Sequence, residues 1–428
     1  MTLCQSRQDV VAITAGLPEA HRRVASLSVF EIVDAISAVA HRWCDLTDRQ
    51  RCEAAVCGLA SETTFPFSCL TRSHLRTLLK SELGNPAVLD DFQPRPAEGG
   101  FVRAFGPGCI THLFPGNVSD VAIVGLVSAL LVKSASLARI GHNDGALSRW
   151  FVGTLREEHP TLADACILAT WEAERRDITQ AAFERSDCVV VYGSDETIAA
   201  VRPLIPPAVR ALFHGHRVSF GAIAQECCRK EVAVAAVADI VAHDQRGCLS
   251  PHLYYVESGG RCSPLDFAEA LAQVLGEVCR TPPAVSPANA ARIWQLRAAL
   301  PLSGGVVFQS AAGINWTVLY DPDPRFCLSP FGRTIWIKPV PDLANIAPHL
   351  QTVRSHLQAV GLAAPPERLP GLARYFSEIG IGRICPIGAM QRPPLTWHHD
   401  GRFRLLDLLR FVDWETPESS SASPAPSV

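Results

Sequence analysis

One cysteine stands where a nucleophile could act: Cys248, within residues 244–251. This segment connects an apolar helical run at residues 230–243 to a run with strand character that begins at Leu253. Functional residues are frequent on such connections. A thiol with a pKa of about 8.5 is already partly thiolate at neutral pH, and backbone N–H groups, which Gly247 would let approach, would raise that fraction. The alternative is that Cys248, one of 15 cysteines, is a small buried apolar residue.

The composition narrows the class of protein. The chain has 428 residues, 48% of them hydrophobic, so we expect two intertwined domains. A net charge of −3 without a long Lys/Arg run argues against nucleic acid or anionic membrane as partner. The longest apolar run, residues 121–132, is shorter than the ~20 residues that span a bilayer, and the first residues lack the apolar core of a secretion signal. Because the chain has no CxxC pair and no zinc-type spacing, we expect reduced thiols, no metal site and a cytoplasmic enzyme.

The order of elements predicts an α/β protein behind a helical N-terminal region. Ser28 with Glu31, and Thr47 with Gln50, have the spacing of capping boxes at helix starts. Ser263 followed by Pro264 has the pattern of an N-cap with proline at the first helical position. From residue 101 on, short apolar runs alternate with amphipathic segments, as in a parallel sheet with helices on both faces. We expect strands at residues 109–114, 136–140, 165–170, 188–192, 209–213, 218–222, 253–256, 306–309, 316–320 and 334–338. We expect helices at residues 120–133, 146–158, 178–185, 196–204, 263–279, 287–300, 343–350, 367–379 and 405–414, with an irregular segment at 385–401.

Two positions in this α/β region are candidates for cofactor binding. At Gly193 and Ser194 a strand runs into a helix, and exposed N–H groups with the helix dipole could hold a pyrophosphate. Arg139 ends the second strand with no acidic residue beside it in the sequence, so it could accept the 2′-phosphate of NADPH. The alternative for Arg139 is a solvent-facing arginine. No GxGxxG, P-loop or GxSxG sequence occurs, which leaves an ordinary dinucleotide fingerprint, a P-loop NTPase and a serine hydrolase unsupported.

Five stretches together resemble one family, the acyl-CoA reductases of bacterial bioluminescence operons, a branch of the aldehyde dehydrogenase superfamily. In chain order they read HLFPGNVS at 112–119, VVYGSDET at 190–197, GHRVSFG at 215–221, DQRGCLSP at 244–251 and RICPIGAMQRPPLTWHHDG at 383–401. Their common order is more specific than any single block. The resemblance implies an aldehyde-dehydrogenase-like fold, with a parallel-sheet cofactor domain and an α/β catalytic domain. We expect a helical region at 1–100, a dinucleotide-binding domain at 101–214, a catalytic domain with Cys248 at 215–385, a C-terminal return segment at 386–414 and a disordered tail at 415–428.

The resemblance also implies a reaction. The Cys248 thiolate would attack an acyl-CoA, hold the acyl group as an enzyme thioester, and release an aldehyde after reduction by NADPH. Asn117 matches the asparagine with which the superfamily stabilises the oxyanion, although a turn asparagine is the simpler alternative. Hydrolytic members carry a glutamate in the block that matches residues 213–217, where this chain has no carboxylate. The acyl-enzyme should therefore outlast attack by water.

Three functions remain open at this point. The leading one is reduction of an acyl-CoA, of the fatty class, with NADPH. The same chemistry on an acyl carrier protein or acyl-enzyme partner is a close alternative, and a non-catalytic scaffold subunit of an acyl-transfer complex is a third. Retention of Cys248, Asn117 and the Gly193–Ser194 pair argues against the scaffold. The expected partners are an acyltransferase, an acyl-protein synthetase and further copies of this chain.

The stretch WHHDG at residues 397–401 offers three metal-ligand side chains in a row. Adjacent side chains usually point apart, and no second cluster completes a four-ligand site. We therefore expect a hydrogen-bonded loop bordering the active site or a subunit contact, and assign no metal.

Overall fold

The computed structural model describes residues 1–45, 67–95, 99–116, 120–141 and 145–416. These residues form two compact units. The described residues up to His214 and from Arg402 onward make the first unit, and residues 215–401 make the second. Within the described ranges, no single helix has both the length and the apolar character needed to cross a membrane, although the bent pair at residues 7–25 and 29–44 meets both criteria jointly.

The first unit is built around a six-stranded sheet in which every pairing is parallel. The strand order is β1-β6-β5-β4-β7-β8. In chain order the strands are β1 (Thr2–Leu3), β4 (Cys109–Leu113), β5 (Ala135–Arg139), β6 (Cys166–Thr170), β7 (Cys188–Tyr192) and β8 (Arg210–His214). From β4 the chain first adds strands on one side and then on the other. The carboxyl ends of β4 and β7 therefore flank a topological switch point, where open α/β sheets bind their ligands.

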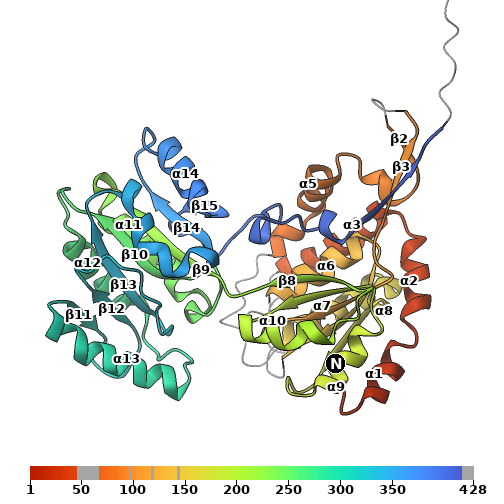
Figure 1. The fold of residues 1–428 in the computed structure, drawn as a ribbon, viewed down its shortest axis with the longest axis horizontal. Helices are drawn as coiled ribbons and strands as arrows, with labels where there is room; N and C mark the ends of the chain where they lie inside the picture. The colour runs from red at the N-terminus through yellow and green to blue at the C-terminus, as the bar shows by residue number, and fades with distance from the viewer. Residues whose placement is uncertain (46–66, 96–98, 117–119, 142–144, 417–428) are drawn as a thin grey trace, which may run out of the picture. The chain divides into compact units, whose positions relative to one another are not determined.

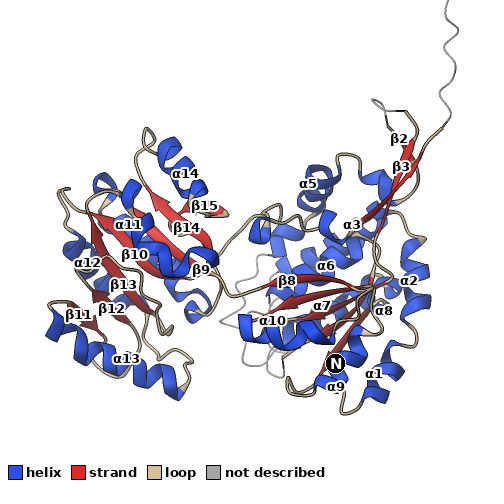
Figure 2. Ribbon diagram, viewed as in Figure 1, coloured by secondary structure: helices blue, strands red, loops and turns tan. Residues whose placement is uncertain are grey.

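Helices cover both faces of this sheet (Figure 2), as parallel crossovers require. They are α1 (Arg7–Thr14), α2 (Leu17–Ala25), α3 (Val29–Cys44), α5 (Arg72–Leu83), α6 (Asp120–Leu131), α7 (Gly145–Glu158), α8 (Pro160–Asp164), α9 (Arg176–Phe183) and α10 (Asp195–Val201). One half of the capping box predicted at Ser28 is confirmed, because its hydroxyl accepts a hydrogen bond from the N–H of Glu31 at the start of α3. The carboxylate of Glu31 instead lies 3.4 Å from Nε2 of His159. The second predicted cap, Thr47 with Gln50, lies outside the described residues.

A small antiparallel sheet of order β16-β3-β2 belongs to the same unit (Figure 1). Its strands are β2 (Gln93–Pro94), β3 (Phe101–Phe105) and β16 (Arg410–Trp414). The predicted helix at 405–414 is therefore wrong. Residues 406–408 form one 3₁₀ turn, and residues 410–414 pair with β3, where the ring of Trp414 lies 5.0 Å from that of Phe101. The apolar spacing imitated a helix, but a strand some 300 positions earlier in the chain supplied the pairing partner.

The second unit contains a seven-stranded sheet of order β11-β12-β13-β10-β9-β14-β15, parallel except for β11 against β12. Its strands are β9 (Val218–Ile223), β10 (Pro251–Glu257), β11 (Val306–Gln309), β12 (Thr317–Tyr320), β13 (Thr334–Val340), β14 (Leu357–Ala363) and β15 (Arg383–Pro386). Its helices are α11 (Lys230–Val241), α12 (Pro264–Val278), α13 (Pro287–Ala299) and α14 (Leu369–Glu378). The cap at Ser263 with Pro264 at the first helical position is confirmed.

The central strand β10 is buried on both faces. Tyr254 and Val256 pack into the core that α11 and α12 cover, whereas Leu253 and Tyr255 pack into the core that α14 and residues 343–350 cover. Both faces of a strand inside a parallel sheet are commonly apolar. A strand in the middle of this sheet, such as β10, therefore requires a continuous run of apolar residues rather than an alternation of apolar and polar residues.

In the first unit, strands β1 and β2 fall within residues 1–100, which were expected to be helical, and strand β3 was not predicted. Further differences from the predicted elements lie in the second unit. Residues 343–345 and 347–356 form 3₁₀ turns instead of an α-helix. Strand β14 was not predicted, and β15 overlaps the segment expected to be irregular. By contrast, the predicted bounds of β7 and β11 agree with the structure, and the α/β class is confirmed.

Candidate functional site

Cys248 lies on a tight turn at the amino end of β10, the central strand of the second unit. The turn is closed by a hydrogen bond from the N–H of Ser250 to the carbonyl oxygen of Gly247, 3.0 Å long. The Ser219 hydroxyl of β9 donates to the carbonyl oxygen of Cys248 over 2.8 Å. The sheet thereby fixes the backbone of the candidate nucleophile.

The chain enters this turn through three consecutive left-handed residues. His243, Asp244 and Gln245 have φ of 53°, 48° and 63°. Non-glycine residues rarely adopt this conformation, and each costs of order 1–3 kcal/mol unless the surroundings enforce it. Such strain gathers at functional sites, which singles out the approach to Cys248.

Buried side-chain hydrogen bonds hold the strained residues in place. Gln245 donates from Nε2 to the carbonyl oxygens of Pro251 (3.1 Å) and Thr334 (3.0 Å), and its Oε1 accepts from the N–H of Thr334 (2.7 Å). Asp244 forms an ion pair with Arg333 at 2.7 Å, with both side chains largely buried. One amide thus joins the entry turn to strands β10 and β13, and one ion pair anchors the residue before it.

Burial raises the pKa of the Cys248 thiol to about 12, and the carboxylate of Asp400 acts in the same direction. The N–H groups of Cys248 and Leu249 and the guanidinium of Arg217 act in the opposite direction. The sequence led us to expect a larger thiolate fraction from these N–H groups. They do favour the thiolate, but burial outweighs them, so the thiol is protonated at neutral pH.

Arg217 and Asp400 form a charge pair in the surroundings of Cys248. The Nε of Arg217 donates to Oδ1 of Asp400 over 2.8 Å, and the Asp400 side chain is 2% exposed. Gln358 donates to the same oxygen over 3.4 Å. A carboxylate held in this way acts mainly on the charge around the thiol, because its oxygen is already engaged by two donors.

Two histidines flank the turn, and burial lowers the pKa of both. The pKa of His252 falls to about 4, and its Nδ1 accepts the N–H of Ser329 over 3.0 Å. For His243, burial is reinforced by Arg246 and opposed by Asp244. His252 is therefore a neutral residue whose Nδ1 is already engaged by the backbone of Ser329.

The loop after β15 packs beside the Cys248 turn within the same unit. The carboxylate of Asp239 accepts the N–H of Met390 over 2.9 Å, and Arg383 donates to the carbonyl oxygen of Met390 over 2.6 Å. Gln391 then donates to the hydroxyl of Ser250, 3.3 Å away. Asp239 and Arg383 thus fix this loop beside the turn that carries Cys248, the candidate nucleophile.

In the first unit, Gly193 and Ser194 follow β7 at the carboxyl edge of the six-stranded sheet. The Ser194 hydroxyl caps α10 by accepting the N–H of Thr197 over 3.3 Å. Asp195 and Glu196 occupy the first turn of this seven-residue helix. The hydroxyl of Ser194 thus already has a structural role, and pyrophosphate binding here stays a prediction.

Arg139 is the last residue of β5, at the same edge of the same sheet. Its guanidinium donates to the carbonyl oxygen of Trp171 from Nε (3.3 Å) and from one terminal nitrogen (3.0 Å). Burial lowers the pKa of Arg139, while Glu172 and Glu174 act in the opposite direction. The sequence neighbours of Arg139 are not acidic, but the fold brings two carboxylates into its surroundings.

Aromatic rings line this carboxyl edge. The ring centroids of His112 and Phe114 lie 5.0 Å apart, and those of Tyr192 and His214 lie 4.4 Å apart, each pair nearly parallel. Complete burial lowers the pKa of His112 to about 3, so this ring is neutral. Asn117, the predicted oxyanion donor, follows β4 in the chain but lies outside the described residues.

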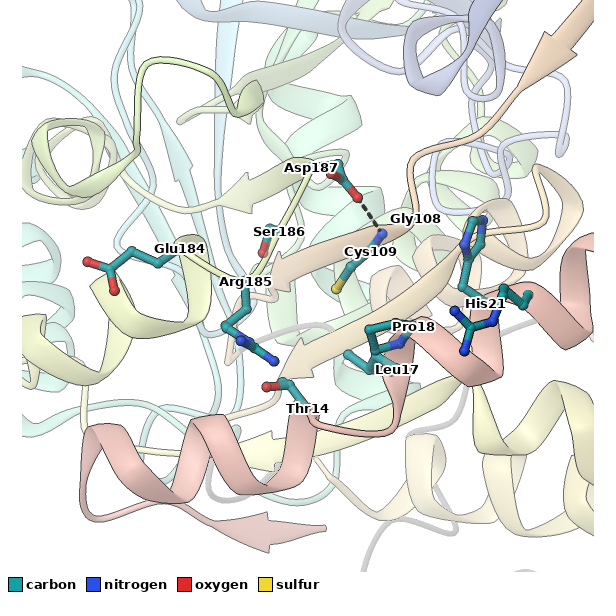
Figure 3. A pocket seen from close by; sticks show the side chains of 11 residues that line it. Thr14, Leu17, Pro18, His21, Gly108, Cys109, Glu184, Arg185, Ser186 and Asp187 are labelled. Carbon is teal, nitrogen blue, oxygen red and sulfur yellow. Dashed lines mark hydrogen bonds between the residues drawn. The ribbon is translucent and has the colours of Figure 1, made fainter.

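Figure 3 shows a cavity of about 480 Å³ at the opposite, amino edge of the sheet. Asp187 lies in its wall and accepts the N–H of Cys109 over 2.9 Å. Burial lowers the pKa of the neighbouring His21, against the effect of Asp187. The described candidates Arg139 and Gly193 do not line this cavity, so we do not assign it to the reaction.

Sequence reasoning missed the residues that hold Cys248 in place. Arg217 and Asp400 lie within two of the resembling stretches, which was the available signal. Gln245 and Thr334 are 89 positions apart and carry no shared pattern. Only the folded sheet brings these two together.

Comparison with known proteins identifies the family. Residues 24–411 match the model of the family described as acyl-CoA reductase (LuxC). A long-chain acyl-protein thioester reductase from Aliivibrio fischeri is 24% identical over 352 residues, covering 81% of this chain and 72% of its own length. The protein of the same name from Photorhabdus luminescens is 23% identical over 365 residues, with coverage of 82% and 72%.

Solved aldehyde dehydrogenase structures share the fold. A putative aldehyde dehydrogenase from Anabaena variabilis has a TM-score of 0.72 at 14% identity, covering 98% of this chain and 95% of that one. GapN from Methanocaldococcus jannaschii, a glyceraldehyde-3-phosphate dehydrogenase complexed with NADP, has a TM-score of 0.70 at 11% identity, with coverage of 96% and 95%. The chain therefore has the fold of the aldehyde dehydrogenases and belongs to the acyl-CoA reductase (LuxC) family of oxidoreductases.

Proposed function

We propose that this enzyme reduces a long-chain acyl thioester to the aldehyde, using NADPH and a Cys248 acyl-enzyme. The observation that carries the proposal is the strained, hydrogen-bonded turn that presents Cys248 between backbone N–H groups and Arg217. A residue that only filled the core would not need this support. The acyl group is proposed to arrive on a protein, as the names of the most similar relatives indicate.

Cys248 provides the nucleophile. Its thiolate attacks the thioester carbonyl, a new C–S bond forms, and the carrier leaves as a thiol once it takes a proton. The N–H groups of Cys248 and Leu249, which favour the sulfur anion, and the charge of Arg217 stabilise the reacting form. Because the resting thiol is protonated, deprotonation accompanies substrate binding.

The described residues of the first unit fit a dinucleotide. The strand order places β4 beside β7 at a switch point, with Arg139 and Gly193 at the carboxyl ends of the strands on either side of β4. Arg139 would face the 2′-phosphate and Gly193 the pyrophosphate. When bound, the reduced nicotinamide supplies the hydride that the acyl carbon requires.

The chain's own groups then complete the reaction. Reduction of the acyl-enzyme gives a thiohemiacetal on Cys248, which releases the aldehyde as its C–S bond breaks and the sulfur regains a proton. In the balance, one acyl thioester, one reduced cofactor and one proton give an aldehyde, a free thiol and an oxidised cofactor. Asn117 is proposed to donate to the oxyanion of each tetrahedral species, and loss of such a donor typically costs ~2.7–4 kcal/mol.

Water is not activated against the acyl-enzyme in this proposal. The segment where hydrolytic relatives carry a glutamate contains Arg217, and the carboxylate near Cys248, Asp400, is paired with it. Without a free general base, hydrolysis lacks a contribution of about 10²–10⁴-fold. The intermediate therefore persists until hydride arrives.

The test is the intact mass of the protein after mixing with a long-chain acyl thioester and no cofactor. One acyl mass that hydroxylamine removes is expected, and Cys248→Ala should gain none. Cys327→Ala, which removes another partly exposed thiol of the second unit, should label like the parent. Labelling of the Cys248→Ala protein at the parental level would place the nucleophile elsewhere.

The carrier is decided by offering the same acyl chain on CoA and on an acyl carrier protein. Faster labelling by the acyl-protein supports the proposed substrate. Faster labelling by acyl-CoA would favour the alternative that the family description names. A scaffold subunit would acquire no acyl group from either donor, and its aldehyde production would be nil.

Oligomeric state, the acyltransferase and synthetase partners, and a cytoplasmic location remain proposals that follow from the resemblance. Gel filtration of the full chain tests the first of these. Co-purification with an acyl-protein synthetase tests the second.

A further inference from the structure

The second unit contains a pair of cysteines, outside the Cys248 turn, whose side chains face each other. Cys228 follows β9 and precedes α11, and Cys262 follows β10 and precedes α12. Their Sγ atoms are 2.6 Å apart, although the residues are 34 positions apart in the chain. At this distance the two sulfur atoms are in direct contact, with no other atom between them.

We propose that Cys228 and Cys262 form a redox modification site, at which an oxidant of the disulfide or hydroperoxide class converts the two thiols into a reversible disulfide. Cys228 is buried, at 8% exposure, and its nearest polar partner is the thiol of Cys262.

The secondary structure holds the pair together. Strands β9 and β10 are adjacent and parallel, so the loops that leave their carboxyl ends lie side by side. Helices α11 and α12 pack against each other after these loops. Ser263 and Asp266 close a capping box at the residue after Cys262, which fixes the backbone on that side. The contact therefore follows from the register of the sheet.

The difference in exposure gives the two thiols distinct roles. Cys262 is partly exposed, and as the thiolate it attacks one sulfur of glutathione disulfide, releasing one glutathione. Cys228 then attacks Sγ of Cys262 and releases the second glutathione. Two protons leave the cysteines, and their two electrons reduce the oxidant. Burial, followed by the contact with Cys262, raises the pKa of Cys228, so Cys262 rather than Cys228 is the thiol that reacts first with the oxidant.

The site is separate from the nucleophile. Cys248 precedes β10 and Cys262 follows it, so the seven residues of β10, roughly 20 Å of strand, lie between them. The new bond would close a loop that contains α11 and the Cys248 turn. Closing a loop of this length removes conformational freedom from the unfolded chain and should raise Tm by roughly 5–10 °C.

The experiment treats the full chain with glutathione disulfide, alkylates the remaining thiols and maps peptides without reduction. The expected product joins the peptides of Cys228 and Cys262, is lighter by two hydrogens and disappears with dithiothreitol. Cys228→Ser should abolish it. Cys227→Ser, a change at the adjacent cysteine, should retain it together with the rise in Tm.

Three results would overturn the proposal. The first is a link between Cys262 and Cys227, and the second is a lasting mixed disulfide of glutathione on Cys262. The third is a reduced pair under conditions in which other thiols of the chain, Cys248 included, become oxidised.

Discussion

The two sheets present their candidate residues at opposite edges. In the six-stranded sheet, Arg139 and Gly193 lie at the carboxyl ends of strands, where α/β proteins generally bind ligands. In the seven-stranded sheet, Cys248 lies before the amino end of β10. In the first unit, regular strand ends are sufficient to position the candidate residues. In the second unit, Cys248 is positioned by three residues in the left-handed conformation and by the buried side-chain amide of Gln245.

The difference shows two ways of placing a reactive group. At a carboxyl edge, N–H groups and short loops are supplied by the fold itself. At an amino edge, contacts from elsewhere in the sequence must hold the chain in position, and here they come from Thr334, which bonds Gln245, and from Arg333, which pairs with Asp244. Changes in these supports should therefore affect catalysis more than comparable changes in the first unit.

The largest effect is expected for Gln245→Ala. It removes three buried hydrogen bonds and leaves the N–H of Thr334 without its acceptor, which should lower the free energy of unfolding by about 3–5 kcal/mol. Acylation of Cys248 in the folded variant should also slow about 10–100-fold, because small displacements of a nucleophile are costly. Denaturant unfolding and labelling rates measure the two effects.

Gln180→Ala is the matched control in the first unit, where an exposed glutamine makes one hydrogen bond to Glu184. It should change stability by less than about 0.5 kcal/mol. If Gln245→Ala and Gln180→Ala lowered the free energy of unfolding equally, the Cys248 turn would not depend on its buried support more than the first unit depends on a surface contact.

Arg139→Ala tests the carboxyl edge of the first unit. Loss of a charge-assisted contact to the 2′-phosphate should lower kcat/KM for NADPH, by an amount equivalent to about 1–3 kcal/mol of free energy. The value of kcat/KM for NADH should stay almost unchanged. Glu172→Gln should move the preference toward NADPH, since a carboxylate that favours the Arg139 charge would no longer repel the phosphate. An unchanged NADPH/NADH ratio in Arg139→Ala would exclude this residue from the cofactor site.

Asp400→Asn tests the charge balance around Cys248. The pKa of the thiol is raised, so at pH 8 it is mostly protonated and becomes thiolate as the pH rises toward about 12. Removing the carboxylate lowers that pKa, so iodoacetamide should alkylate Cys248 roughly 3–10-fold faster at pH 8. Asp407→Asn, which breaks an exposed pair with Arg402, should leave the rate as it was. Slower alkylation of Asp400→Asn would reverse the assigned sign.

The smallest effect is expected for Ser194→Ala. Loss of the N-cap of α10 should cost about 1 kcal/mol of stability. Ser263→Ala removes the equivalent cap of α12 and should cost a similar amount. If KM for NADPH rises more than about threefold in Ser194→Ala alone, its hydroxyl contacts the cofactor as well as Thr197.

The sequence was informative where a local pattern determines the structure. Strand β7 and the caps at Ser28 and Ser263 were predicted because apolar runs and capping spacings are local. The helix expected at 405–414 was wrong because pairing with β3 overrode local spacing. Cys248 was chosen from its connection and its resembling stretch. The raised pKa of its thiol comes mainly from burial, with Asp400 acting in the same direction and Arg217 opposing it, and burial is a property of the whole fold that no local pattern gives.

The pairing of β16 with β3 also bears on how the chain folds during synthesis. The register joins Phe101 to Trp414 and Phe105 to Arg410, so an emerging ribosomal chain makes β3 long before its partner exists. The whole of residues 215–401 must be synthesised in between. Until then β3 has only the two-residue strand β2 beside it, and its open edge is a surface for a chaperone or for a neighbouring nascent chain. Completion of this small sheet therefore waits until residues 410–414 have been synthesised.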